Sequence, residues 1–84
     1  MTPVDWLGTA AGLCTTIAFL PQVVKVWQTQ SARDISLGMY AILAIGIVFW
    51  LVYGWILGIW PVIVANAVTL VLVAVVIAMK LRWG

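Results

Sequence analysis

The sequence predicts an all-α membrane protein that forms a bundle of three transmembrane helices. Of its 84 residues, 67% are hydrophobic and only 7% are charged, whereas a soluble domain carries roughly 25% charged residues. The uncharged residues form three stretches, and each is close to the roughly 20 residues that a helix needs to cross a bilayer. A chain of this length cannot bury so much apolar surface by folding alone, so we expect a lipid bilayer around it.

The first helix is expected over residues 5–27 and carries Pro21-Gln22 near the end of its apolar stretch. Proline lacks a backbone N–H, and its ring crowds the preceding turn, so it breaks the hydrogen-bond ladder of a helix. In a bilayer such a defect is tolerated only where protein or water satisfies the freed backbone groups. The dipeptide therefore predicts a hinge beside a cavity. A hinge beside a cavity is typical of transport proteins.

The second helix is expected over residues 37–58 and the third over 61–81, which completes a single domain of residues 1–84. No charged residue separates these two helices, and their combined length is too great for one span. We place the break between Gly58 and Pro61, because proline suits the first turn of a helix, where its missing N–H costs nothing.

Basic residues predict how the chain crosses the membrane, because they gather in cytoplasmic loops. Lys25 and Arg33 flank the loop between the first two helices, and Lys80 and Arg82 follow the third. The N-terminus and the second loop carry no basic residue. We therefore expect the N-terminus outside and the C-terminus in the cytoplasm.

The composition argues against several classes of function. With no histidine and one cysteine, Cys14, the chain offers neither a Cys/His metal site nor the groups for acid–base or nucleophilic catalysis. We expect no cofactor and no enzymatic activity, and a net charge of +2 is too small for a nucleic-acid surface. Coupled carriers usually hold an ionisable residue at membrane depth. Because Asp5 and Asp34 lie at the ends of the spans, we expect passive facilitation.

Asn66 and Trp50 are the candidate solute-binding residues of the third and second helices. A side-chain amide in hydrocarbon is costly unless it is paired, so Asn66 either bonds another helix or faces a cavity. Trp50 either packs in the core or presents its ring to the cavity. An indole can stack on the C–H face of a sugar, and an amide both donates to and accepts from hydroxyls. Together they suit a small polyol.

One face of the second helix carries Gly46, Trp50, Tyr53 and Leu57, because 4-3-4 spacing aligns residues on a helix. Tyr53 lies one turn nearer the predicted outside than Trp50, where it either gates the path or anchors the helix at the interface. Leu57 lies one turn further out. We place both at a candidate outer gate.

The half of the first helix that leads to Pro21 contains Thr15, Thr16 and Phe19. Hydroxyls there either line the cavity or bond back to their own helix. We place Thr16 and Phe19 among the candidate substrate-binding residues, and Gln22 with Pro21 at the hinge.

Small residues spaced four apart mark candidate helix–helix contacts, since they let backbones approach closely. Gly8 and Gly12 have this spacing in the first helix, and Gly54 and Gly58 in the second. Three helices pack around a line and not around a pore, so we expect a functional unit of at least two chains.

Four motifs together resemble those of the bacterial SemiSWEETs, the half-size relatives of the SWEET sugar transporters in the PQ-loop group. The resemblance covers nearly the whole chain. Its motifs are the run from Thr15 to Gln22, the loop end Asp34-Ile35-Ser36, the block Trp50-x-x-Tyr53-Gly54 and the block Ala65-Asn66-x-x-Thr69-Leu70.

The resemblance implies helices packed in the order 1-3-2 and a parallel homodimer in the bacterial inner membrane. It implies a path on the two-fold axis and alternating access for mono- or disaccharides of the glucose or sucrose class. Trp50 and Asn66 match the sugar-pocket pair of the family, and Pro21 matches its hinge proline.

The resemblance also assigns Tyr53 to an outer gate. Some members carry an arginine and an aspartate shortly after this tyrosine, whereas Leu57 and Ile59 stand there in this chain. An apolar outer gate would then replace a charged one.

Two other interpretations of the function remain: a PQ-loop carrier of another small solute such as an amino acid, and a membrane assembly subunit that transports nothing.

Overall fold

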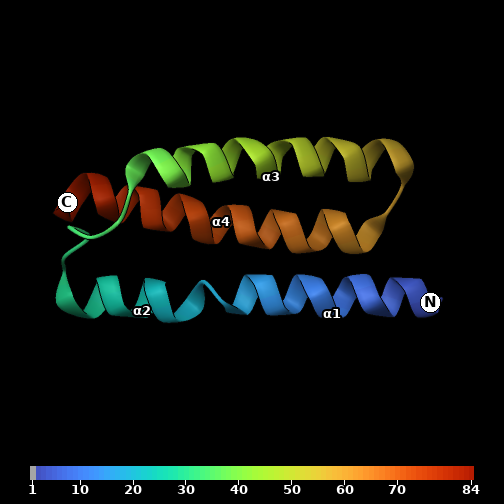
Figure 1. The fold of residues 1–84 in the computed structure, drawn as a ribbon, viewed down its shortest axis with the longest axis horizontal. Coiled ribbons are helices and arrows are strands. Elements are labelled where there is room, and N and C mark those ends of the chain that lie inside the picture. Colours follow the sequence, from blue (N-terminus) through green and yellow to red (C-terminus); the bar gives the residue numbers. More distant parts are fainter. Residues whose placement is uncertain (1) are drawn as a thin grey trace.

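The computed structural model describes residues 2–84 and confirms an all-α bundle of three membrane-length spans (Figure 1). Residue 1 of the predicted domain lies outside the described part. The bundle is 42 Å long, which exceeds the roughly 30 Å hydrocarbon core of a bilayer. The first span consists of two consecutive helices. The elements are α1 (Pro3–Ile17), α2 (Leu20–Thr29), α3 (Leu37–Leu57) and α4 (Trp60–Trp83).

A capping box fixes the start of α1. The backbone N–H of Asp5 donates to the Thr2 hydroxyl at 3.1 Å, and the backbone N–H of Thr2 donates to the Asp5 carboxylate at 3.2 Å. These bonds satisfy N–H groups that the first turn of a helix leaves unpaired. Pro3 follows the cap, where its missing N–H is harmless.

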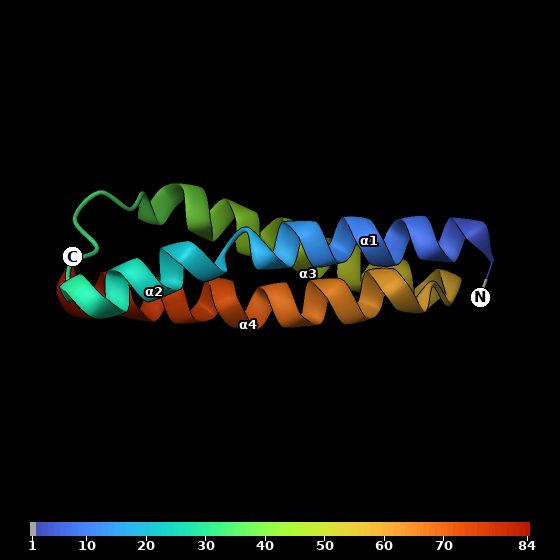
Figure 2. The ribbon, with the colours of Figure 1, turned by 90° about the horizontal axis from the view of Figure 1, so that it is seen from below.

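Two residues, Ala18 and Phe19, separate α1 from α2, and the break is visible in Figure 2. The N–H of Phe19 bonds the Thr16 carbonyl at 3.1 Å, which tightens the last turn of α1. Pro21 then lies in the first turn of α2, where it needs no hydrogen-bond acceptor. The single helix expected over 5–27 is therefore two helices, with the interruption just before the proline.

The loop between α2 and α3 is attached to the end of α4. Lys80 Nζ donates to the Ala32 carbonyl at 3.0 Å, and the Ala32 N–H bonds the Trp83 carbonyl at 3.4 Å. Ser36 caps α3 by accepting from the Met39 N–H at 3.1 Å. The loop thereby joins the first span to α4 although the two are distant in sequence.

The helix α4 lies between the first span and α3, which confirms the 1-3-2 order (Figure 1). It contacts α1, α2 and α3, whereas α1 and α3 share no contact within residues 2–84. Small residues lie at two of these contacts. A Cβ added to Gly12 would lie 2.5 Å from the Ala65 Cβ, and one added to Gly54 would lie 3.0 Å from Val62.

Gly58 has a different role from the helix–helix contact that its spacing predicted. It ends α3 in the left-handed conformation, with φ at 68°, which glycine adopts without strain. A Cβ there would meet no atom within 4 Å. The position therefore serves the turn between α3 and α4.

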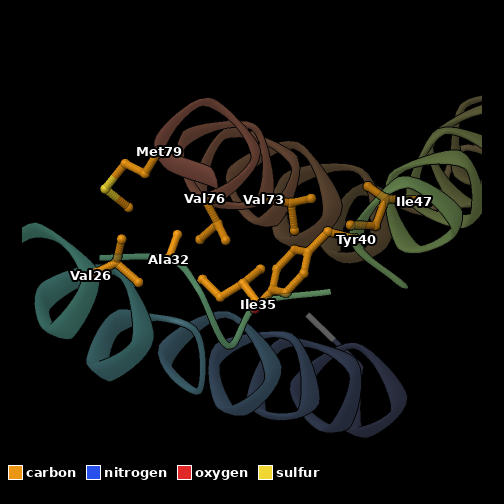
Figure 3. Packing of buried hydrophobic residues seen from close by; sticks show 8 residues of the cluster. All are labelled: Val26, Ala32, Ile35, Tyr40, Ile47, Val73, Val76 and Met79. Atoms are coloured by element: carbon orange, nitrogen blue, oxygen red, sulfur yellow. The ribbon is translucent and has the colours of Figure 1, made fainter. Parts of the chain in front are cut away.

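The buried core occupies the half of the bundle that holds the C-terminus and the α2–α3 loop (Figure 3). Val73 and Val76 of α4 are completely buried at its centre. The members of this core are Val26, Ala32, Ile35, Tyr40, Ile47, Val73, Val76 and Met79.

We predict that Gly12→Ala destabilises the protein by about 1–3 kcal/mol, as overpacking of a close contact does. The added methyl would collide with Ala65 and force α1 away from α4. Unfolding in detergent would measure the change, with Gly38→Ala as control, because a Cβ at Gly38 meets nothing. Equal stability of Gly12→Ala and the parent would contradict this packing.

Candidate functional site

A groove of about 650 Å³ runs between α1 and α3 and has α4 as its floor. The groove is possible because α1 and α3 share no contact within residues 2–84. One wall carries Trp50, whose side chain is 54% exposed, so the groove is open along one side. Its polar side chains are Thr15, Trp50, Asn66 and Thr69.

Asn66 lines the groove and does not form the interhelical hydrogen bond that was the alternative. Its Nδ2 donates to the Val62 carbonyl one turn earlier in α4, at 2.9 Å. That bond uses one of two N–H donors and fixes the direction of the amide. Within residues 2–84 the Oδ1 atom has no hydrogen-bond partner. An acceptor and a donor therefore remain available to a solute.

Trp50 lines the same groove from α3 and is supported by Tyr53. The two rings meet edge to face, with centroids 5.4 Å apart and planes at 86°, a favoured geometry for aromatic pairs. Tyr53 itself is not part of the groove wall. Tyr53 follows Trp50 by three residues towards the end of α3, and the contact between the two rings restricts the orientation of the indole.

Leu57, the other residue of the candidate outer gate, also lies outside the groove. It is the last residue of α3 and its side chain is 56% exposed. Within one chain, Leu57 does not cover the groove.

Thr16 lies in the contact between α1 and α4 and not in the groove. The Thr69 hydroxyl donates its one hydrogen to the Ala65 carbonyl at 2.8 Å. The bond between the Thr16 and Thr69 hydroxyls, also 2.8 Å, must therefore be donated by Thr16. Thr16 borders a smaller pocket of about 120 Å³, which shares Gly12, Pro61 and Ala65 with the groove but none of the groove's polar side chains.

Thr15 and Thr69 also line the groove. The sequence left open whether the Thr15 hydroxyl lines the cavity, and Thr69 was not among the candidate site residues. Thr15 bonds back to the Gly12 carbonyl at 3.1 Å, as a hydroxyl in a helix often does. Thr69 follows Asn66 by three residues, and this spacing already places the two on one face of α4.

Phe19 links the groove to the buried core. It lines the groove at the end nearest the helix break, and its ring meets Tyr40 edge to face at 6.2 Å. Tyr40 belongs to the core. Pro21 and Gln22 lie just beyond it in α2, outside the groove, and Gln22 lines a separate pocket of about 200 Å³ beside the loop.

No charged side chain lines the groove among residues 2–84. The basic residues lie at the other end of the bundle, where Lys25 and Arg33 border the loop pocket together with Asp34. The groove therefore offers an aromatic face, an amide and two hydroxyls without a fixed charge. This combination suits a neutral solute that has both apolar C–H faces and hydroxyl groups.

Comparison with known proteins gives a family match over most of the chain. The family model described as the PQ loop repeat matches residues 4–63. A protein of Bradyrhizobium diazoefficiens named sugar transporter SemiSWEET is 50% identical over 78 residues, which are 93% of this chain and 91% of the relative. A protein of the same name from Leptospira biflexa is 44% identical over 78 residues, 93% and 92% of the two chains.

Two solved structures share the fold. A crystal structure of a bacterial homologue of SWEET transporters superposes with a TM-score of 0.95 at 43% identity, covering 99% of this chain and 100% of that one. A crystal structure of SemiSWEET in the inward-open conformation gives a TM-score of 0.86 at 35% identity, covering 98% and 88%.

We predict that Thr16→Val lowers the free energy of unfolding by about 0.6 kcal/mol, a typical value for an interhelical side-chain hydrogen bond in a membrane. The substitution removes the hydrogen that Thr16 donates to Thr69. Denaturant titration in detergent would measure it. Thr15→Val is the matched control, because its hydroxyl bonds its own helix. Equal losses of unfolding free energy in the two variants would show that the Thr16–Thr69 hydrogen bond does not stabilise the bundle.

Proposed function

This chain belongs to the PQ-loop family and, within it, to the bacterial SemiSWEETs, and we propose that it is a passive transporter of mono- or disaccharides. The family consists of transporters and not of enzymes. One observation carries the proposal: an uncharged groove combines the Trp50 ring with the Oδ1 atom and the second N–H of Asn66, which have no hydrogen-bond partner within residues 2–84. Sugars present both C–H faces and hydroxyls, and this pair matches both.

In the proposed complex the indole of Trp50 stacks on one face of the sugar ring. Asn66 accepts a hydrogen bond from one sugar hydroxyl through Oδ1 and donates another through its free N–H. The bond from Nδ2 to Val62 holds the amide in place before the sugar arrives. Such preorganisation lowers the ordering cost of binding.

We propose that a second copy of the chain completes the site. The groove is open along one side, and apolar residues of α3 such as Trp50 and Tyr53 stay about half exposed in one chain. A parallel homodimer with the two grooves facing each other across a two-fold axis covers these surfaces. Each sugar then meets two copies of Trp50 and of Asn66, and the path runs along the axis.

Alternating access in this proposal uses the break at Ala18 and Phe19. The helix ladder is already interrupted there, so α1 and α2 can change their relative angle without losing further hydrogen bonds. With the basic end of the bundle in the cytoplasm, Tyr53 and Leu57 meet their partner copies as an apolar outer gate. Alternating access requires an outward-open and an inward-open state, and a related protein was solved in an inward-open conformation.

The uncharged groove supports facilitation without ion coupling. A proton- or sodium-coupled carrier usually holds an ionisable group at membrane depth, and the groove lining contains none within the described residues. The same feature argues against a zwitterionic amino acid, whose buried charges would need partners.

We predict that Asn66→Ala lowers counterflow of labelled sugar in proteoliposomes by about tenfold, the effect of losing a hydrogen bond to a buried polar partner. The dimer should persist, since Asn66 bonds only its own helix. Thr16→Ser, outside the groove, serves as control and should exchange sugar like the parent. If Asn66→Ala exchanges sugar as fast as the parent does, Asn66 is excluded from the site. If the folded parent itself exchanges no sugar, another solute or a structural role is favoured.

We predict that Pro21→Ala slows sugar exchange while sugar affinity and dimer content stay unchanged. Alanine restores the N–H that proline lacks, and a continuous helix through residues 18–21 would be stiffer. Exchange rates in proteoliposomes, compared with equilibrium binding in detergent, would separate the two effects. An unchanged exchange rate would contradict the hinge.

A further inference from the structure

The smaller pocket lies on the other side of the contact between α1 and α4 from the groove. Its volume is about 120 Å³, and it shares only Gly12, Pro61 and Ala65 with the groove. Nearby residues of α1 line the two spaces, Leu13 the pocket and Thr15 the groove. The close contact between the two helices is therefore all that separates the pocket from the groove.

The lining of the smaller pocket suits an apolar occupant. Its two hydroxyl groups have already used their hydrogens, since Thr9 donates to the Asp5 carbonyl at 2.8 Å and Thr16 donates to Thr69. Among residues 2–84 no charged side chain lines the pocket, and its remaining side chains are apolar apart from the indole N–H of Trp60. A sugar would lose its hydrogen bonds to water there without replacing them.

The smaller pocket opens to the surroundings of the bundle. Leu13, Val64 and Val68 border it, and their side chains are exposed. Both helices belong to spans that are long and apolar enough to cross a membrane. Trp60, the first residue of α4, also borders the pocket, and tryptophan favours the level of the lipid headgroups. The pocket therefore begins near the headgroups and follows the two helices into the hydrocarbon.

We propose that the smaller pocket binds one acyl chain of a phospholipid. Its α1 residues extend from Thr9 to Thr16, about 10 Å along the helix, which suits a thin, extended chain. An apolar void that nothing fills forfeits dispersion contacts, on which membrane helices depend for their association. The chain restores these contacts and supports the approach of Gly12 to Ala65. This inference rests on the proposed dimer, in which the grooves face each other and this side of the bundle faces lipid.

The test is photo-cross-linking in proteoliposomes that contain a phosphatidylcholine with a diazirine on one acyl chain. Proteolysis and mass spectrometry then locate the adducts along α4. The parent should carry more adducts at residues 60–68 than at Val71 and Val75, which are exposed on α4 but line neither the pocket nor the groove. Val68→Phe fills the pocket with its own ring and should abolish this excess. Val71→Phe, the matched control of equal size, should keep it.

The remaining outcomes decide whether the pocket recognises the acyl chain. Adducts spread evenly over the exposed residues of α4 in the parent would indicate ordinary lipid contact and overturn the site. An excess that both Val68→Phe and Val64→Phe leave unchanged would overturn it as well. No adducts at residues 60–68 of the folded parent would mean that another protein surface covers the pocket, which also contradicts the inference.

A second lipid and a separate assay distinguish the acyl chain from the headgroup and the pocket from sugar transport. Phosphatidylglycerol with the same labelled chain should give the same adducts, because the pocket contacts the chain. Adducts from this lipid alone would show recognition of the headgroup and overturn the acyl-chain site. The cross-linking needs no sugar, so a parent that fails in sugar counterflow but shows the expected adducts would overturn the proposed function and leave the lipid site standing.

Discussion

The contact between α1 and α4 determines where the groove lies. Gly12 lets α1 approach Ala65 so closely that no larger residue fits, and one turn further the Thr16 hydroxyl donates to Thr69. Both interactions hold α1 against one side of α4, whereas α3 packs along another side. Because α1 and α3 never meet, the space between them stays open. The position of the α1 residues in the groove follows from this arrangement.

The bundle has a packed half, which contains the buried core, and a second half, which contains most of the groove. Buried apolar residues (Figure 3) and the hydrogen bond from Lys80 to the Ala32 carbonyl hold the half with the C-terminus together. The groove occupies much of the other half. The helix break lies at the boundary, and Phe19 contacts both the groove and the core through Tyr40. In the transport proposed above, a hinge at this point would change the width of the groove while the packed half keeps its structure.

The fold was largely predictable from the sequence, because apolar length and the positions of Pro21 and Pro61 limit where helices begin and end. The site was only partly predictable. Spacing shows which residues share a face, but the rotation of α1 depends on the Gly12–Ala65 contact, which turns Thr15 into the groove and Thr16 away from it. Similarly, only the three-dimensional structure reveals that Asn66 bonds its own helix and keeps its Oδ1 free.

In the proposed dimer two chains face each other through their grooves, and disulfide cross-linking in native membranes distinguishes this arrangement from other pairings of the chains. With Cys14 replaced by serine, Tyr53→Cys places a single thiol beside the Trp50 wall, and Val64→Cys places one on the exposed side of α4 that borders the smaller pocket. We expect cross-linked dimers for Tyr53→Cys and none for Val64→Cys. Cross-linking through Val64→Cys alone would show that the two grooves do not face each other.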